Sequence, residues 1–217
     1  MPKRKLIIVL VAAFLLAAAT PAVAQAPQMT LAIMKPGQGP QGTVTTVLYG
    51  ELVRVSGNIT RGGANQNVEL IISPYRGTPR RVTLRTDDDG FFRHAHRPNI
   101  RTSYAARMGS LASRQEPYAH VRPKVGLRAS RVRGRLVFRW TMQAQPEHVS
   151  KVAWFQRRVS RTRWVNVKKI QTTRRNLSRR FTATLPRGFQ RVRIFVPQTP
   201  GYLRTTSRFV RVRGLGR

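Results

Sequence analysis

The sequence contains no cysteine. This absence excludes disulfide bonds, cysteine-based zinc sites, thiol catalysis and a lipid-modified cysteine behind an export signal. We therefore expect the fold to be held by its hydrophobic core alone. The chain has 217 residues, which is long enough for two domains of about 95 residues each after a short N-terminal segment.

Acidic residues are also scarce. The chain has 41 Lys and Arg residues against 7 Asp and Glu residues, a formal net charge of +34. All seven acids lie between Glu51 and Glu147, so the last 70 residues carry no side-chain carboxylate. The positive electrostatic field of such a chain attracts polyanions. The alternative is an Arg-rich genomic composition, which would place arginine on solvated strand faces with no ligand.

Only one long apolar run is present, from Leu6 to Ala19. Its 14 residues fall short of the roughly 20 that span a bilayer as a helix. Basic residues precede it, and Ala22-Val23-Ala24 fits a signal-peptidase site. We predict a signal peptide over residues 1–24 and a secreted or cell-envelope location, with a retained N-terminal anchor as the alternative. No later stretch is apolar enough to span a membrane.

Catalytic and metal-binding signatures are lacking too. There is no G-x-S-x-G nucleophile elbow and no P-loop, so we expect no enzyme, no cofactor and no metal. Asp87-Asp88-Asp89-Gly90 could suggest a calcium loop, but no further acid follows until Glu116, and we predict a solvated turn. His94 and His96 share one face of a strand, yet further ligands are distant. Scattered surface histidines are the preferred interpretation.

What the chain does contain is a series of short alternating segments. Asp89-Gly90 forms a tight-turn dipeptide between Arg81–Arg85 and Phe91–His96, which predicts a β-hairpin. Further strands are predicted in the first half at the spacing of a β-sandwich, over Met29–Met34, Val44–Leu48, Leu52–Ile59, Val68–Ile72, Thr102–Met108 and Tyr118–Pro123.

The second half repeats this plan in the same order. Its predicted strands are Gly134–Trp140, Val149–Gln156, Trp164–Ile170, Asn176–Pro186, Arg191–Val196 and Ser207–Arg213. The fold class is therefore all-β, with two tandem Ig-like β-sandwiches after an N-terminal signal-peptide helix. We assign residues 25–42 to a flexible leader with one edge strand, 43–124 to the first sandwich and 125–217 to the basic second one. Arg122–Leu127 forms the short joint.

Several of these motifs resemble those of a known family. The matching motifs are Thr86–Phe92, Thr102-Ser103-Tyr104 and Val121-Arg122-Pro123 in the first half and Gly201-Tyr202 in the second. They resemble the tandem Ig-like or fibronectin-III-like repeats of exported actinobacterial proteins. The resemblance implies spacer or binding modules without catalytic residues.

The strongest binding signal is a cluster of basic residues with aromatics among them. Its members are Arg157, Arg158, Arg161, Arg163, Lys168, Lys169, Arg174, Arg175, Arg179 and Arg180. Arginine forks suit phosphate, sulfate or carboxylate. We expect the accompanying Trp154, Phe155 and Trp164 to lie in the core. The favoured partner is an anionic envelope polymer. The alternatives are a structural or adhesion module that recognises a protein partner or, less compatible with export, a nucleic-acid binder.

Overall fold

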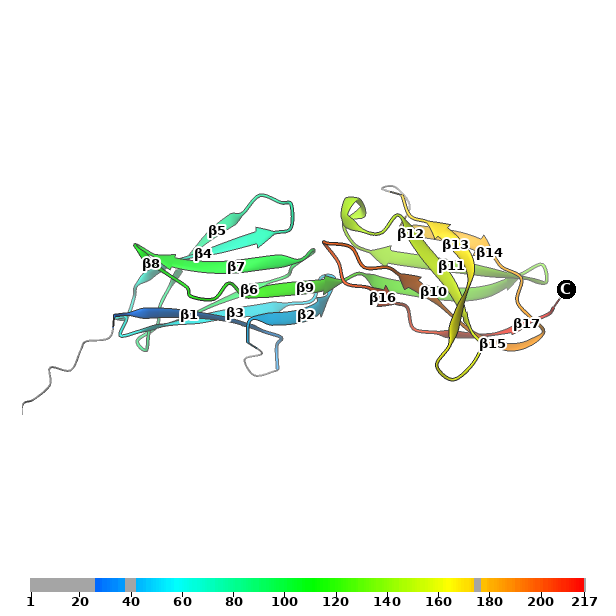
Figure 1. Cartoon of the computed structure of the whole chain (residues 1–217), viewed down its shortest axis with the longest axis horizontal. Helices are drawn as coiled ribbons and strands as arrows, with labels where there is room; N and C mark the ends of the chain where they lie inside the picture. The colour runs from blue at the N-terminus through cyan, green and yellow to red at the C-terminus, as the bar shows by residue number, and fades with distance from the viewer. Residues whose placement is uncertain (1–25, 38–41, 174–176, 217) are drawn as a thin grey trace, which may run out of the picture.

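The computed structural model describes residues 26–37, 42–173 and 177–216, so the predicted signal peptide lies outside the described residues. Apart from the 3₁₀ helix η1 (Pro146–His148), the elements of this described part are β-strands. Strands β1–β9 and strands β10–β17 share no sheet. Figure 1 shows the two sets as units placed end to end. The predicted all-β fold of two tandem sandwiches is confirmed. None of the described residues forms a helix long and apolar enough to cross a bilayer.

The first sandwich consists of a three-stranded sheet, in the order β1-β3-β6, facing a larger sheet in the order β2-β9-β7-β4-β5 with β8 beside β7. Strands β2 and β9 pair in parallel, and an isolated parallel bridge joins Met29 to Ser113. The strands are β1 (Gln28–Met34), β2 (Val44–Leu48), β3 (Val53–Thr60), β4 (Asn67–Pro74), β5 (Arg80–Arg85), β6 (Phe91–His96), β7 (Thr102–Met108), β8 (Leu111–Ala112) and β9 (Tyr118–Arg122).

The second sandwich has the same plan, with a sheet in the order β10-β11-β14 facing a sheet in the order β13-β12-β15, in which β16 and β17 both pair with β15. Its strands are β10 (Lys124–Val132), β11 (Arg135–Gln143), β12 (Val152–Arg158), β13 (Trp164–Gln171), β14 (Ser178–Thr182), β15 (Gly188–Val196), β16 (Thr205–Thr206) and β17 (Val210–Gly214). The matching sheet orders support the predicted repeat. Strand β10 was missed, because its first residues were interpreted as the joint between sandwiches.

The predicted β-hairpin around Asp89-Gly90 is wrong. Strand β5 pairs with β4, whereas β6 pairs with β3, so the turn carries the chain from one sheet to the other. The Asp87 carboxylate accepts hydrogen bonds from the backbone N–H groups of Asp89 (3.2 Å) and Phe91 (2.8 Å). The N–H of Ile59 donates to the carbonyl oxygen of Gly90 at 3.0 Å. The Asp87 bonds stabilise the turn itself, and the bond from Ile59 attaches it to β3.

The leader assignment for residues 25–42 also needs correction. The edge strand expected there is present as β1, which pairs with β3 over its whole length. Its side chains Met29, Leu31 and Ile33 are fully buried in the core. Residues 28–34 therefore belong to the first sandwich, since a segment that buries three large apolar side chains is fixed by them.

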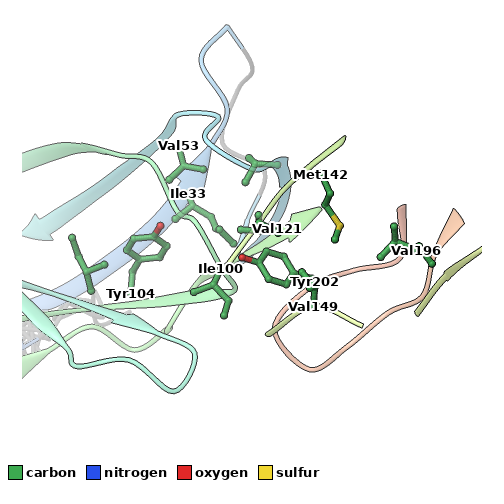
Figure 2. Packing of buried hydrophobic residues seen from close by; sticks show 14 of the residues in the cluster. Ile33, Val53, Ile100, Tyr104, Val121, Met142, Val149, Val196 and Tyr202 are labelled. Carbon is green, nitrogen blue, oxygen red and sulfur yellow. The ribbon is translucent and has the colours of Figure 1, made fainter. Parts of the chain in front are cut away.

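The two sandwiches also contact each other directly. The backbone N–H of Leu203 donates to the carbonyl oxygen of Val121 at 3.0 Å, and that of Arg101 to Gly201 at 3.1 Å. Figure 2 shows Ile100, Val121 and Tyr202 close together at this junction. All three side chains are buried. A packed contact, as well as the chain itself, therefore joins the sandwiches.

Candidate anion-binding surfaces

The second sandwich has almost no carboxylate with which its cations could pair. Residues 125–217 contain 24 Lys and Arg residues and a single acid, Glu147. Within the described part of this half, no side chain takes part in an ion pair; the Arg81–Glu69 pair at 3.2 Å lies in the first sandwich. The guanidinium groups must therefore be positioned by other neighbours.

On the larger sheet of this sandwich, aromatic rings provide those neighbours. In β15, Val192, Ile194 and Val196 are buried, so the alternate residues Phe189, Arg191 and Arg193 lie on the outer face. Strand β17 places Arg211 directly opposite Arg191. We call this surface the stacked-arginine face; it comprises Trp164, Phe189, Arg191, Arg193, Phe209 and Arg211.

Each of the three arginines on the stacked-arginine face lies over a different ring. The Arg193 Cζ atom is 4.1 Å from the centroid of the Trp164 ring. The corresponding distances are 4.3 Å from Arg211 to Phe189 and 5.1 Å from Arg191 to Phe209. These distances are within the range of favourable cation–π contacts.

Arg193 is held further by a short chain of polar side chains. Its Nε donates to Oε1 of Gln156 at 2.9 Å, and Nε2 of Gln156 donates to Oδ1 of Asn166 at 2.9 Å. Burial lowers the pKa of the Arg193 guanidinium from its ordinary value. An arginine nonetheless stays protonated at neutral pH, because that ordinary value is so high. Its charge is thus fixed in place across three strands.

The β12–β13 loop extends this surface. Nε of Arg158 donates to the carbonyl oxygen of Ser160 at 2.9 Å, and a second bond joins Arg158 to the carbonyl of Arg161. A shallow hollow is lined by Arg158, Arg161, Phe189 and Arg191, together with Val159 and Ser160. The loop arginines therefore adjoin the stacked-arginine face.

The opposite sheet carries a second basic feature. Arg128 of β10 is directly opposite Arg139 of β11, which is directly opposite Arg180 of β14. All three side chains are exposed. We call them the arginine row. Directly opposed like charges destabilise a sheet, so this arrangement favours an anion at its surface.

The structure does not bring the ten predicted basic residues together. Arg158, Arg161 and Arg163 lie in or beside the β12–β13 loop, and Lys169 is opposite Trp154 on the outer face of the larger sheet. Arg180 belongs to the arginine row on the other sheet, where Arg179 is opposite the buried Trp140. Arg174 and Arg175 lie outside the described residues.

Two of the ten have structural contacts instead. Lys168 is opposite the buried Phe155, and its Nζ donates to the carbonyl oxygen of Thr182 on the facing sheet at 3.0 Å. Arg157 is opposite the buried Val192 and donates to Oε1 of Gln190 at 3.4 Å. Both point to the inner side of the sheet, away from a polymer on its outer face.

The predicted core position is correct for only one of the three aromatics in that segment. Phe155 is fully buried, whereas Trp154 and Trp164 are half-buried and outside the core cluster. Trp154 lies between the buried Ala153 and Phe155, so strand alternation turns it outward. The alternating arginines of 188–196 and 208–213 were the sequence signal for the stacked-arginine face, which the predicted set left out.

The paired histidines are not scattered over the surface either. His94 and His96 are half-buried on the same side of β6 as the core residue Phe92. Nδ1 of His96 is 2.9 Å from the hydroxyl oxygen of Tyr104. Burial, with the neighbouring His94 and Arg80 charges, lowers the pKa of His96. No three His, Asp or Glu side chains among the described residues are grouped so that they could hold a metal ion.

Comparisons with known proteins give a likeness of fold. No protein-family model and no curated protein matches the chain. A tetra-tandem repeat from the extending region of a large adhesion protein is similar at 15% identity, over 87% of this chain and 50% of that one, with a TM-score of 0.42. Dimeric latent PorU from Porphyromonas gingivalis follows at 12% identity, over 88% of this chain and 20% of that one, with a TM-score of 0.36. The chicken CNTN1 FN1–FN3 domains share 12% identity over 74% of this chain and 61% of theirs, with a TM-score of 0.30.

This chain spans half of the first of these structures and a fifth of the second. At such scores the likeness carries no argument about what this chain binds.

Proposed function

We propose that the protein is an exported, non-enzymatic binding module of the cell envelope, whose second sandwich holds an anionic envelope polymer by salt-sensitive contacts. The observation that carries the proposal is the set of opposed arginines in a sandwich with one carboxylate. Arg128, Arg139 and Arg180 lie side by side, and none of them forms an ion pair with an acid among the residues that the structure describes. A polymer of negative charge would relieve this repulsion and release its own counterions on binding.

Export is part of the proposal and rests on the N-terminal sequence. A basic segment, an apolar run of 14 residues and a small-residue cleavage site stand in the order of a secretory signal. A polymer partner outside the cytoplasm follows from that location. Nucleic acid suits the charge but not the location, and for this reason it is the weaker alternative.

The test is retention of the purified protein on cell envelope across a salt series. We expect binding at low salt and release that rises steeply with salt, because screening and counterion competition weaken contacts between exposed charges. Absence of retention at the lowest salt would refute the proposal. Retention that does not respond to salt would favour the alternative of a protein partner.

A pair of variants tests whether the second sandwich is responsible. The first replaces three of its arginines by glutamine, namely Arg139, Arg180 and Arg211. The control makes the same replacement at three exposed arginines of the first sandwich, namely Arg54, Arg85 and Arg93. Both variants lose three charges. Release should shift to lower salt in the first variant and much less in the control; equal shifts would assign binding to overall charge rather than to the second sandwich.

A further inference from the structure

We infer that the stacked-arginine face is a binding site for an acidic polysaccharide, in which the aromatic rings hold the arginines ready for the sugar carboxylates. This inference rests on the proposed function and names the site and the class of ligand.

Aromatic rings hold the three arginines of this face. Arg193, Arg211 and Arg191 lie over Trp164, Phe189 and Phe209 at 4.1, 4.3 and 5.1 Å. An arginine in an ion pair uses its N–H donors on the paired carboxylate. An arginine stacked on a ring is positioned through the face of its guanidinium plane, so donors at the edge of that plane stay available to a ligand. In Arg193 the Nε donor is used by Gln156, which leaves the two terminal nitrogens of its guanidinium group for a ligand.

The three charges are closely spaced on β15 and β17. Arg191 and Arg211 are directly opposite on neighbouring strands, which places their backbones about 5 Å apart. Arg193 follows Arg191 by two residues on the same face, or about 7 Å along the strand. A linear polymer with an acidic group on successive units can therefore meet several of these guanidinium groups at once.

Exposed apolar surface lies beside these charges. Phe189 is 66% exposed and Phe209 is 53% exposed, although an arginine lies over each ring. Such exposed aromatic surface offers an amphipathic contact that suits the C–H face of a sugar ring. A polyphosphate has no apolar surface to place there. The hollow lined by Arg158, Arg161, Phe189 and Arg191 continues the same combination toward the β12–β13 loop.

The experiment uses variants that keep the net charge of the full chain. One replaces Phe189 and Phe209 by threonine, and the other replaces Arg191, Arg193 and Arg211 by lysine, which keeps the charge but loses the planar fork. The probes are polygalacturonate and polyphosphate of matched charge, with affinity measured by calorimetry at fixed salt. We expect each variant to bind polygalacturonate about 10-fold more weakly, since several ring or fork contacts are lost together. The variant that lacks Phe189 and Phe209 keeps all three arginine forks, so it should bind polyphosphate within about 2-fold of the unmodified protein.

The matched control is Phe91→Thr, because Phe91 is an exposed aromatic of the first sandwich at 43%. Thermal unfolding of every variant verifies the fold. Unchanged polygalacturonate binding in both variants, with salt-sensitive envelope retention intact, would overturn this inference and leave the proposed function standing. Loss of all polyanion binding by the unmodified protein at low salt would overturn both. Tighter binding of single-stranded DNA, lost in the phenylalanine variant, would overturn the polysaccharide assignment in favour of nucleic acid.

Discussion

The hydroxyl of Tyr202 donates a hydrogen bond to the carbonyl oxygen of Asn99 at 2.5 Å, although the two residues are 103 positions apart and belong to different sandwiches. The same hydroxyl accepts a bond from the backbone N–H of Gln145 at 2.8 Å. Burial raises the pKa of Tyr202 to about 12, so the hydroxyl remains a proton donor at all ordinary pH values. One side chain thus connects the loop before β7 to two segments of the second sandwich.

Replacing Tyr202 by phenylalanine should weaken this junction. The change leaves the Asn99 carbonyl without this donor and the Gln145 N–H without this acceptor, at a cost of about 1–3 kcal/mol in unfolding free energy. Chemical unfolding measures the loss, and small-angle scattering should show a wider range of inter-sandwich orientations. Tyr118→Phe is the control, because the hydroxyl of Tyr118 has no hydrogen bond within the described residues. Equal stability of the two variants would refute the role of Tyr202.

Gly57 should tolerate no side chain. It lies opposite Phe92 in the pairing of β3 with β6, and a Cβ atom there would be 2.1 Å from Cζ of Phe92 and 2.6 Å from the carbonyl oxygen of Thr30. Gly57→Ala should therefore destabilise the protein by about 3 kcal/mol, the upper part of the range for overpacked cores. Gly63→Ala is the control, since its added Cβ would meet only Nε2 of Gln66 at an ordinary 3.5 Å. Thermal melts that fall together would contradict the prediction.

The Asp87 side chain should contribute to the stability of the protein, whereas that of its neighbour Asp88 should not. The Asp87 carboxylate accepts two backbone hydrogen bonds within the turn, an arrangement like that of a capping side chain. Asp87→Ala should cost about 0.5–2 kcal/mol of unfolding free energy. Asp88→Ala removes the same charge, and the Asp88 carboxylate has no hydrogen bond within the described residues, so its stability should stay close to that of the unmodified protein. A calcium titration of both variants would show any metal-dependent contribution separately.

Most strands could be predicted from the sequence because alternation and turn residues are local signals. The partners of those strands could not. Asp89-Gly90 identifies a turn correctly, but the pairing of β5 with β4 and of β6 with β3 is what shows that the chain crosses to the other sheet. Strand β10 was not predicted for a similar reason. Its alternation of buried and exposed residues is weak, since Val125 is half-buried and Leu127 is buried, and its pairing with β11 is what makes it a strand.

The sequence predicted that the candidate site would be basic, but not which residues form it. A shortage of acids is visible in composition, and it indicated a basic second half. Proximity in sequence then suggested a cluster around Arg157–Arg180, whereas strand pairing sends Lys168 inward and Arg180 to the opposite sheet. The register of β15 with β17 places Arg191 against Arg211, a relationship that no local pattern reports.

Stability should fall as the pH drops below neutrality. Burial, then the charges of His94 and Arg80, lowers the pKa of His96 from its ordinary value of 6.5. The folded protein protonates His96 less readily than the unfolded chain does. The contribution of neutral His96 to the unfolding free energy is therefore complete above pH 6.5 and is lost as the pH falls toward the lowered pKa of the folded state. Unfolding free energies measured from pH 8 to pH 5, a range set by about 1.5 units on either side of that ordinary value, should fall less steeply in His96→Gln. Parallel profiles for the two proteins would contradict this.

Repulsion within the arginine row should lower the unfolding free energy of the protein when no polymer is bound. Arg139 of β11 lies between Arg128 and Arg180, so Arg139→Gln should raise the unfolding free energy by about 0.2–1 kcal/mol at low salt. The gain should disappear at high salt, where exposed charges are screened. Arg54→Gln is the matched control, because Arg54 occupies the middle strand of the equivalent sheet but faces the uncharged Met34 and Ala95. If Arg139→Gln makes the protein more stable and also weakens polymer binding, the repulsion in the row serves binding. Equal effects of the substitutions at Arg139 and Arg54 would mean that the row reflects composition alone.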